Sequence, residues 1–251
     1  KNGKGLLPLG NAMPAAPSSR LARINLGSSS DDQFWQRVNN VEDPVPSFKI
    51  VLDEPEDIAG EFFRWSFATA VAAALIGVNP FDEPDVSASK KITRDLLDAQ
   101  ELTTEPTVVP VAELAATLQS AGSRSYLAVL NYLPSDPTVN DMLDEFAQSV
   151  RDRFGLPVSV NAGPRYLHST GQLRKGGPDH GVFLFVYGEP LQDLDIFAED
   201  FGFAALNQAQ AMGDCAELSR IGRSVCWINL DGPRFAQMQR LRALLKECLD
   251  W

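Results

Sequence analysis

The chain has 251 residues, of which 44% are apolar and 22% are charged, a composition typical of a folded globular protein. This length excludes a disulfide-stabilised miniprotein and predicts two domains, each with a core of its own. Acidic residues number 33 and basic residues 22, and the net charge of −11 disfavours nucleic acid and membrane surfaces as partners, because both are anionic.

The first part of the chain predicts short strands followed by helices. Residues 1–5 lead into no apolar segment, which excludes a signal peptide and favours a piece of a longer polypeptide. Residues 48–52 predict a strand, and the acidic residues and proline after it predict a helix over about 58–76 that ends at Gly77. Apolar side chains lie on nearly all sides of this helix, so we expect it to be largely buried.

A second helix is predicted over about 84–99, after a turn that Pro80 imposes. Residues 100–111 contain two prolines and three threonines, which predict a linker or a sheet edge and the boundary between two domains. The least polar stretch, residues 65–78, is shorter than the roughly 18 apolar residues of a membrane span, so no transmembrane helix is expected.

Beyond this linker, strand and helix patterns alternate regularly. Strands are predicted at residues 126–130, 158–160, 182–186 and 225–230, and helices over residues 139–154, 203–221 and 235–249. Such alternation predicts a parallel sheet that is covered by helices on both faces.

Cysteine and histidine are scarce, which limits the possible redox and metal chemistry. Cys215, Cys226 and Cys248 form no Cys-x-x-Cys pair, so we expect free thiols in a reducing compartment, the cytoplasm. His168 and His180 are too few for a histidine-rich metal site, and we expect neither a metal nor another cofactor.

Residues 163–178, directly after a predicted strand, combine an imidazole, two hydroxyls, an amide and three cationic side chains. In open parallel sheets the carboxyl ends of the strands form the crevice in which ligands bind. The imidazole of His168 can exchange protons near pH 7, as the opening of a sugar ring requires. A structural interpretation stays open, in which Ser169 or Thr170 caps a helix and His168 bonds to a backbone carbonyl.

A second candidate segment is formed by residues 79–90. Its acidic residues Asp82, Glu83 and Asp85 lie at the start of the predicted helix, where the helix dipole favours negative charge. Lys90 follows two helical turns later. Residue type alone predicts that Lys90 is an ordinary solvent-exposed lysine.

Three segments resemble phosphoglucose isomerases. Residues 67–90, which end in Asn-Pro-Phe-Asp-Glu-Pro-Asp-Val-Ser-Ala-Ser-Lys, look like the carboxyl-terminal signature of that family. Residues 1–9 resemble the stretch after the family's catalytic Glu-Ser-x-Gly loop. Residues 166–178, Tyr-Leu-His-Ser-Thr-Gly-Gln-Leu-Arg-Lys-Gly-Gly-Pro, are similar to the downstream extension of bifunctional transaldolase/phosphoglucose isomerases. The three segments occur in the family's order and extend over most of the chain.

The resemblance implies an α/β fold with two parts: a partial parallel-sheet sandwich of the sugar-isomerase type over residues 1–100, and a second, appended α/β domain over residues 105–251. It implies the interconversion of glucose 6-phosphate and fructose 6-phosphate through a cis-enediol. The family's proton-transfer glutamate and phosphate cradle would precede Lys1, in the missing N-terminal part of the same polypeptide. The isolated chain is therefore expected to be inactive, and a homo-oligomer is compatible with the sequence.

The resemblance also implies roles for individual residues. Lys90 falls on the lysine that contacts the substrate during ring opening, and Glu83 occupies the place of a glutamine. Ring opening needs a histidine as well, and because residues 1–90 contain none, His168 is the candidate. The predicted catalytic residues are thus Lys90 and His168, and the predicted substrate-binding residues are Glu83, Ser169, Thr170, Gln172 and Lys175. Arg174 departs from the histidine that is usual in the family.

Two other functions fit the sequence. One is a non-catalytic module that binds or senses sugar phosphates. In such a module Glu83 and Arg174, which depart from the family's pattern, would reflect a catalytic activity that was lost while binding was retained. A structural domain that docks a transaldolase would instead expose an apolar patch and have no affinity for sugar phosphates.

Overall fold

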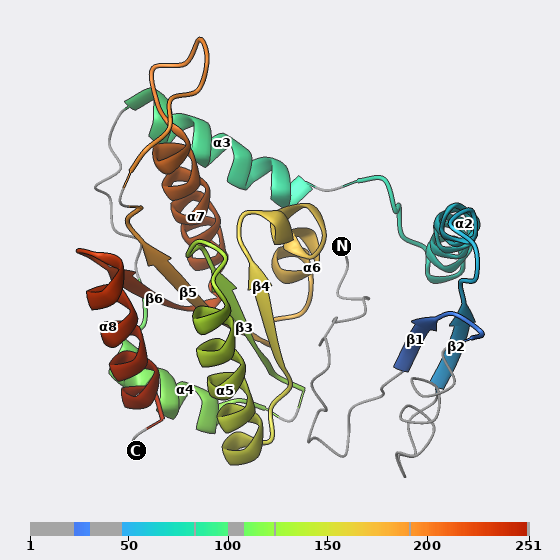
Figure 1. Ribbon diagram of the computed structural model, residues 1–251, viewed down its shortest axis with the longest axis horizontal. Coiled ribbons are helices and arrows are strands. Elements are labelled where there is room, and N and C mark those ends of the chain that lie inside the picture. Colours follow the sequence, from blue (N-terminus) through green and yellow to red (C-terminus); the bar gives the residue numbers. More distant parts are fainter. Residues whose placement is uncertain are drawn as a thin grey trace. The chain divides into compact units, whose positions relative to one another are not determined.

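The computed structural model in Figure 1 describes residues 23–30, 47–82, 84–99, 108–122, 124–190 and 192–249. These residues form two compact units, one of residues 23–82 and one of residues 84–249. Within the described ranges, no helix combines the length and the apolar character that a membrane span requires.

The first unit contains a two-stranded parallel sheet and one long helix. β1 (Arg23–Gly27) pairs with β2 (Ser47–Val51), and α2 (Asp57–Ile76) follows. The carboxylate of Asp57 accepts hydrogen bonds from two preceding backbone amides, which stabilises the helix start. Gly77, with φ 68°, ends the helix in the left-handed region that glycine adopts without steric cost. The predicted limits of this helix are confirmed to within a residue.

The surroundings of α2 differ from the prediction. Ala73 is its only buried residue, and Phe62, Phe63 and Leu75 are 71%, 74% and 82% exposed. The expectation of a largely buried helix is therefore wrong. A helix that is apolar on all sides needs neighbours on several sides, and the described part of its unit adds only two short strands.

The second unit is an α/β fold built on a four-stranded parallel sheet with the order β4-β3-β5-β6. Its strands are β3 (Tyr126–Asn131), β4 (Val158–Ala162), β5 (Gly181–Gly188) and β6 (Ser224–Leu230). Its helices are α3 (Pro84–Ala99), α4 (Leu114–Ser120), α5 (Pro137–Phe154), α6 (Gly171–Gly176), α7 (Phe203–Arg220) and α8 (Arg234–Glu247), with short 3-10 helices η1 (Val111–Glu113) and η2 (Arg165–His168). The predicted parallel sheet and its alternation with helices are confirmed.

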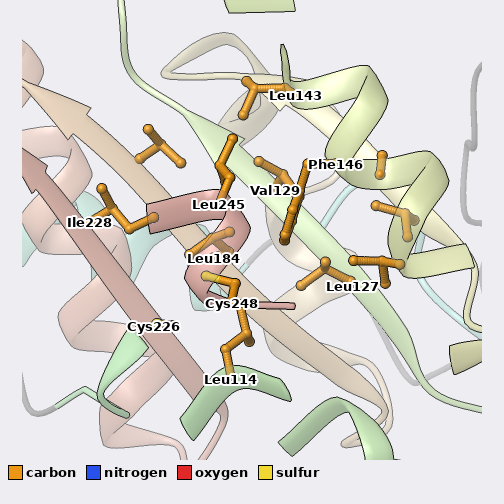
Figure 2. Close-up of a cluster of buried hydrophobic side chains, with 14 of the residues drawn as sticks. Leu114, Leu127, Val129, Leu143, Phe146, Leu184, Cys226, Ile228, Leu245 and Cys248 are labelled. Atoms are coloured by element: carbon orange, nitrogen blue, oxygen red, sulfur yellow. The ribbon is translucent and has the colours of Figure 1, made fainter. Parts of the chain in front are cut away.

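Helices cover both faces of this sheet, whose central strands β3 and β5 are almost entirely buried. Every residue of β5 is buried, and successive side chains enter different cores. Leu184 belongs to the core beneath α4, α5 and α8, where Figure 2 shows it near Val129, Phe146 and Leu245. Phe185 belongs to the opposite core, which α7 and η2 cover.

α3 packs beside α7, and Gly213 permits this close approach (Figure 1). A Cβ atom at Gly213 would lie 2.5 Å from Oγ1 of Thr93 and 3.2 Å from the carbonyl oxygen of Ser89, both in α3. Because α3 packs on α7 and α6, it belongs to the second unit. The two units accordingly divide between residues 82 and 84, whereas the sequence analysis placed the boundary at 100–105. Residues 100–107 lie outside the described ranges.

Candidate functional site

A pocket with a volume of about 500 Å³ lies between α3, η2, the segment that follows β5, and α7. Small-molecule sites commonly have this size. The polar residues along its wall include Lys90, Arg94, Asp98, His168, Glu199 and Gln210. Both η2 and the segment that contains Glu199 follow the carboxyl ends of strands, the edge at which open parallel sheets bind ligands.

The pocket brings together the two residues that were predicted to be catalytic. Lys90 comes from α3 and His168 from the last position of η2, and both residues are exposed. Within the described ranges, neither side chain has a hydrogen-bond or ion-pair partner. Their polar atoms are therefore available to a ligand in the pocket.

Six polar residues of the pocket were not predicted as site residues, and Ser89 and Thr93 of α3 are two of them. Arg94 and Asp98 lie one and two turns after Lys90 on α3, so the three side chains share one helix face. Glu199 lies between β5 and α7, and Gln210 lies on α7. The spacing of charged residues at positions 90, 94 and 98 was the one available signal, and Glu199 and Gln210 had none.

Lys175, which was predicted to bind substrate, lies in the interior instead of the pocket wall. Its ammonium group forms an ion pair with the carboxylate of Asp214 in α7, and both side chains are 1% exposed. The positive charge of Lys175, which was predicted to contact the ligand, is therefore neutralised by Asp214. This placement connects α6 to α7.

The other predicted substrate-binding residues also lie away from the described pocket wall. The Ser169 hydroxyl donates to the carbonyl oxygen of Tyr166 at 3.2 Å, and the Thr170 hydroxyl reaches the same oxygen at 3.4 Å. Both hydroxyls thus contact the backbone of η2, and neither forms the predicted helix cap, because Thr170 precedes α6 without a capping hydrogen bond from its side chain. Gln172 is buried. Glu83 lies outside the described residues.

Buried polar side chains from other elements form hydrogen bonds with Tyr166 of η2. The hydroxyl of Tyr166 donates to Oδ2 of Asp214 at 2.6 Å, and the hydroxyls of Tyr132 and Tyr166 lie 2.9 Å apart. Burial, together with the negative charge of Asp214, raises the pKa of both tyrosines well above its usual value, so both hydroxyls stay protonated. Because Tyr166 belongs to η2, this network fixes the backbone that carries His168.

Arg174 adds a positive charge to this network. Its side chain is 2% exposed, and its guanidinium carbon lies 4.6 Å from the centre of the Tyr166 ring, a cation–π contact. None of its guanidinium nitrogens has a hydrogen-bond acceptor among the described residues. Burial lowers the pKa of Arg174, whereas the nearby tyrosines and Asp214 act in the opposite direction.

The cysteines lie apart from the pocket. Cys215, Cys226 and Cys248 are free thiols in the interior. Within the ranges that the structure describes, no group of three or more histidine, cysteine, aspartate and glutamate side chains is placed to hold a metal ion.

Comparison with solved structures finds a distant similarity to a hypothetical protein, TT0462, from Thermus thermophilus. The TM-score is 0.46 and the sequence identity is 15%, over 90% of this chain and 56% of that chain. The chain thus spans little more than half the length of that protein. No protein-family model and no curated protein matches the sequence.

Proposed function

We propose that the chain is the carboxyl-terminal portion of a glucose-6-phosphate isomerase, and that the pocket of Lys90 and His168 binds the sugar phosphate. One observation supports this assignment most directly. Two residues predicted from separate segments of the sequence line a single pocket with the volume of a small-molecule site. The proposal assigns the first unit to a partial sugar-isomerase sandwich and the second unit, which includes α3, to an appended α/β domain.

In this proposal His168 opens the sugar ring. Ring opening breaks the bond between C1 and the ring oxygen, removes the proton of the C1 hydroxyl and delivers a proton to the ring oxygen. An imidazole suits both transfers because its ordinary pKa is close to neutral pH. Lys90, in the same pocket, stabilises the negative charge that develops on oxygen during the reaction.

The proton transfer between C2 and C1 requires a separate base. By resemblance, this base is a glutamate in the part of the polypeptide that precedes Lys1, so this chain supplies substrate binding and ring opening. The enediolate that forms carries negative charge on oxygen, and the cationic side chains of the pocket favour it. Loss of a general base typically lowers a rate by about 10² to 10⁴.

Calorimetry with fructose 6-phosphate tests the site directly. We expect Lys90→Ala and His168→Ala to weaken binding by about tenfold or more, since each removes a polar contact. Lys91→Ala and His180→Ala are matched controls, because neither residue lines the pocket and Lys91 pairs with Asp95 at the surface. Isomerisation is then measured in the longest natural polypeptide, and unchanged turnover in both pocket variants would contradict the assignment.

A structural domain that docks a transaldolase is a second candidate, favoured by the exposed apolar side chains of α2. It predicts no affinity for fructose 6-phosphate. A non-catalytic sugar-phosphate module predicts binding in the same calorimetry, but no isomerisation by the longest natural polypeptide. The two measurements therefore separate all three functions.

A further inference from the structure

The segment between β5 and α7 carries exposed apolar side chains. Phe197 is 99% exposed and Leu194 is 63% exposed. The segment is nevertheless fixed to the start of α7, because the carboxylate of Asp193 accepts hydrogen bonds from the backbone amides of Leu194 and Ala204, each at 2.7 Å. Phe197 is therefore held in place at the surface. Aromatic side chains of this kind are enriched in protein interfaces.

The surroundings of Phe197 are acidic. Residues 189–202 include five acidic residues and no basic residue. Asp195, Glu199 and Asp200 lie within three residues of Phe197, and all three are exposed. A surface that accepts Phe197 therefore needs an apolar pocket with positive charge beside it.

The second unit has a pocket with this character beside α8. It has a volume of about 250 Å³, and its apolar wall is formed by Val108, Val111, Trp227, Ile228 and Leu244. Arg240 of α8 also lines it, and α8 contains four basic residues and one acidic residue. The pocket is smaller than most small-molecule sites, and its size suits a single side chain.

This pocket lies at the outer edge of the four-stranded sheet, because β6 is the last strand in the order β4-β3-β5-β6. The bridge from Val109 to Cys226 is the one pairing that the described residues give this edge. Strand edges with unpaired backbone groups associate readily with other chains. Figure 1 shows the segment after β5 projecting beyond α7, away from α8, so the segment and the pocket lie apart within one copy.

We propose that Phe197 of one copy of the chain inserts into the pocket beside Arg240 of a second copy. The apolar wall of the pocket covers the phenyl ring, and the acidic residues around Phe197 face the cations of α8. A second copy fits because each chain carries both complementary surfaces, and their opposite charges offset the repulsion between two chains of net charge −11. Because the two surfaces differ, the contact is head-to-tail.

Sedimentation velocity of the full chain, at concentrations up to about 200 µM, tests this contact, since interfaces of small area bind weakly. We expect the unchanged chain to associate, and Phe197→Ser and Arg240→Glu each to weaken the association by about tenfold or more. Phe62→Ser removes another exposed phenylalanine, and Arg124→Glu makes the same charge change outside the pocket, so both are matched controls. Thermal unfolding checks the fold of each variant, and Arg240→Gln takes the place of Arg240→Glu if the latter does not fold.

An equimolar mixture of Phe197→Ser and Arg240→Glu shows whether these two surfaces meet. Each variant keeps the surface that the other has lost, so we expect the mixture to form pairs and nothing larger, although each variant alone is monomeric. A mixture that stays monomeric refutes the proposal, as does an unchanged chain that is monomeric at every concentration. If Phe62→Ser weakens the association as much as Phe197→Ser does, the contact involves α2 and the proposal is refuted as well.

Discussion

Lys175 and Asp214 form an ion pair from which solvent is almost completely excluded, each side chain being 1% exposed. Desolvating two charges is unfavourable, and their mutual attraction offsets this only while both are present. The pair joins α6 to α7, and Asp214 also accepts the hydroxyl of Tyr166 in η2. Three elements next to the pocket therefore depend on one carboxylate.

Removing only the cation should destabilise the fold strongly. We expect Lys175→Met to lower the free energy of unfolding by about 3–5 kcal/mol, because it leaves Asp214 charged and buried without its cation. The double variant Lys175→Met, Asp214→Leu should recover much of this loss. Urea denaturation measures all variants, with Lys91→Met as the surface control. A Lys175→Met variant as stable as the unchanged chain would show that the pair is not buried as described.

Removal of the Tyr166 hydroxyl tests the same network of buried polar side chains in a second way. Tyr166→Phe removes the donor that lies 2.6 Å from Asp214, and we expect a loss of about 1–3 kcal/mol, the typical result of leaving a buried charged acceptor without a donor. Tyr126→Phe is the control, since Tyr126 is only partly buried and its hydroxyl makes no hydrogen bond within the described ranges. Equal stability losses in both variants would argue against a specific role for the Asp214 contact.

Gly213 should be intolerant of any side chain. In Gly213→Ala the new Cβ would meet Thr93 and the backbone of Ser89, so α3 must shift away from α7. We expect a destabilisation of about 1–3 kcal/mol and weaker binding of fructose 6-phosphate, because Lys90 and Arg94 move with α3. Gly60→Ala in α2 is the control, since nothing lies within 4 Å of its added Cβ. If Gly213→Ala left both stability and binding unchanged, the described packing of α3 would be incorrect.

The buried thiols should make the fold sensitive to alkaline pH. Burial raises the pKa of Cys226 and Cys248 to about 12, from an ordinary value of 9.0. The unfolded chain therefore loses these protons first, and stability that is fully present below pH 9 falls as the pH rises towards 12. Each thiol contributes a slope of up to about 1.4 kcal/mol per pH unit.

Urea denaturation between pH 8 and pH 10.5 measures this slope, and Cys226→Ala should reduce it. As an independent check, a thiol reagent at pH 8 should react slowly with the folded chain and rapidly with all three cysteines in urea. Rapid reaction of the folded chain would mean that the thiols are accessible. A stability that stayed constant over this pH range would mean that their pKa values are ordinary.

Local signals in the sequence predicted most elements of the fold. Gly77 ends α2, α3 begins at Pro84 as predicted, and the apolar run in β5 indicates a strand buried on both faces. Local signals could not predict which other elements each helix packs against. Whether the aromatic residues of α2 are covered, and whether α3 joins the first or the second unit, depends on contacts between distant parts of the chain.

The candidate site was predictable to a similar extent. Lys90 was predicted from the resemblance and His168 by elimination, because residues 1–90 contain no histidine, and the two residues line one pocket. Arg94 was missed because charged residues spaced four apart, such as those at 90, 94 and 98, are common on exposed helix faces and do not by themselves indicate a site. Lys175 was assigned to the ligand because its buried partner, Asp214, lies in a different helix and cannot be identified from spacing.

The order of the strands has a consequence for how the chain is synthesised. β3, the first strand of the four-stranded sheet to be made, pairs with β4 and also with β5, which is made after α6. α8 completes the core on the face that α5 covers, through Leu241 and Leu245. During synthesis this face of β3 therefore stays partly uncovered until α8 has been made, and contacts between such distant parts of the chain are expected to slow the folding of the unit.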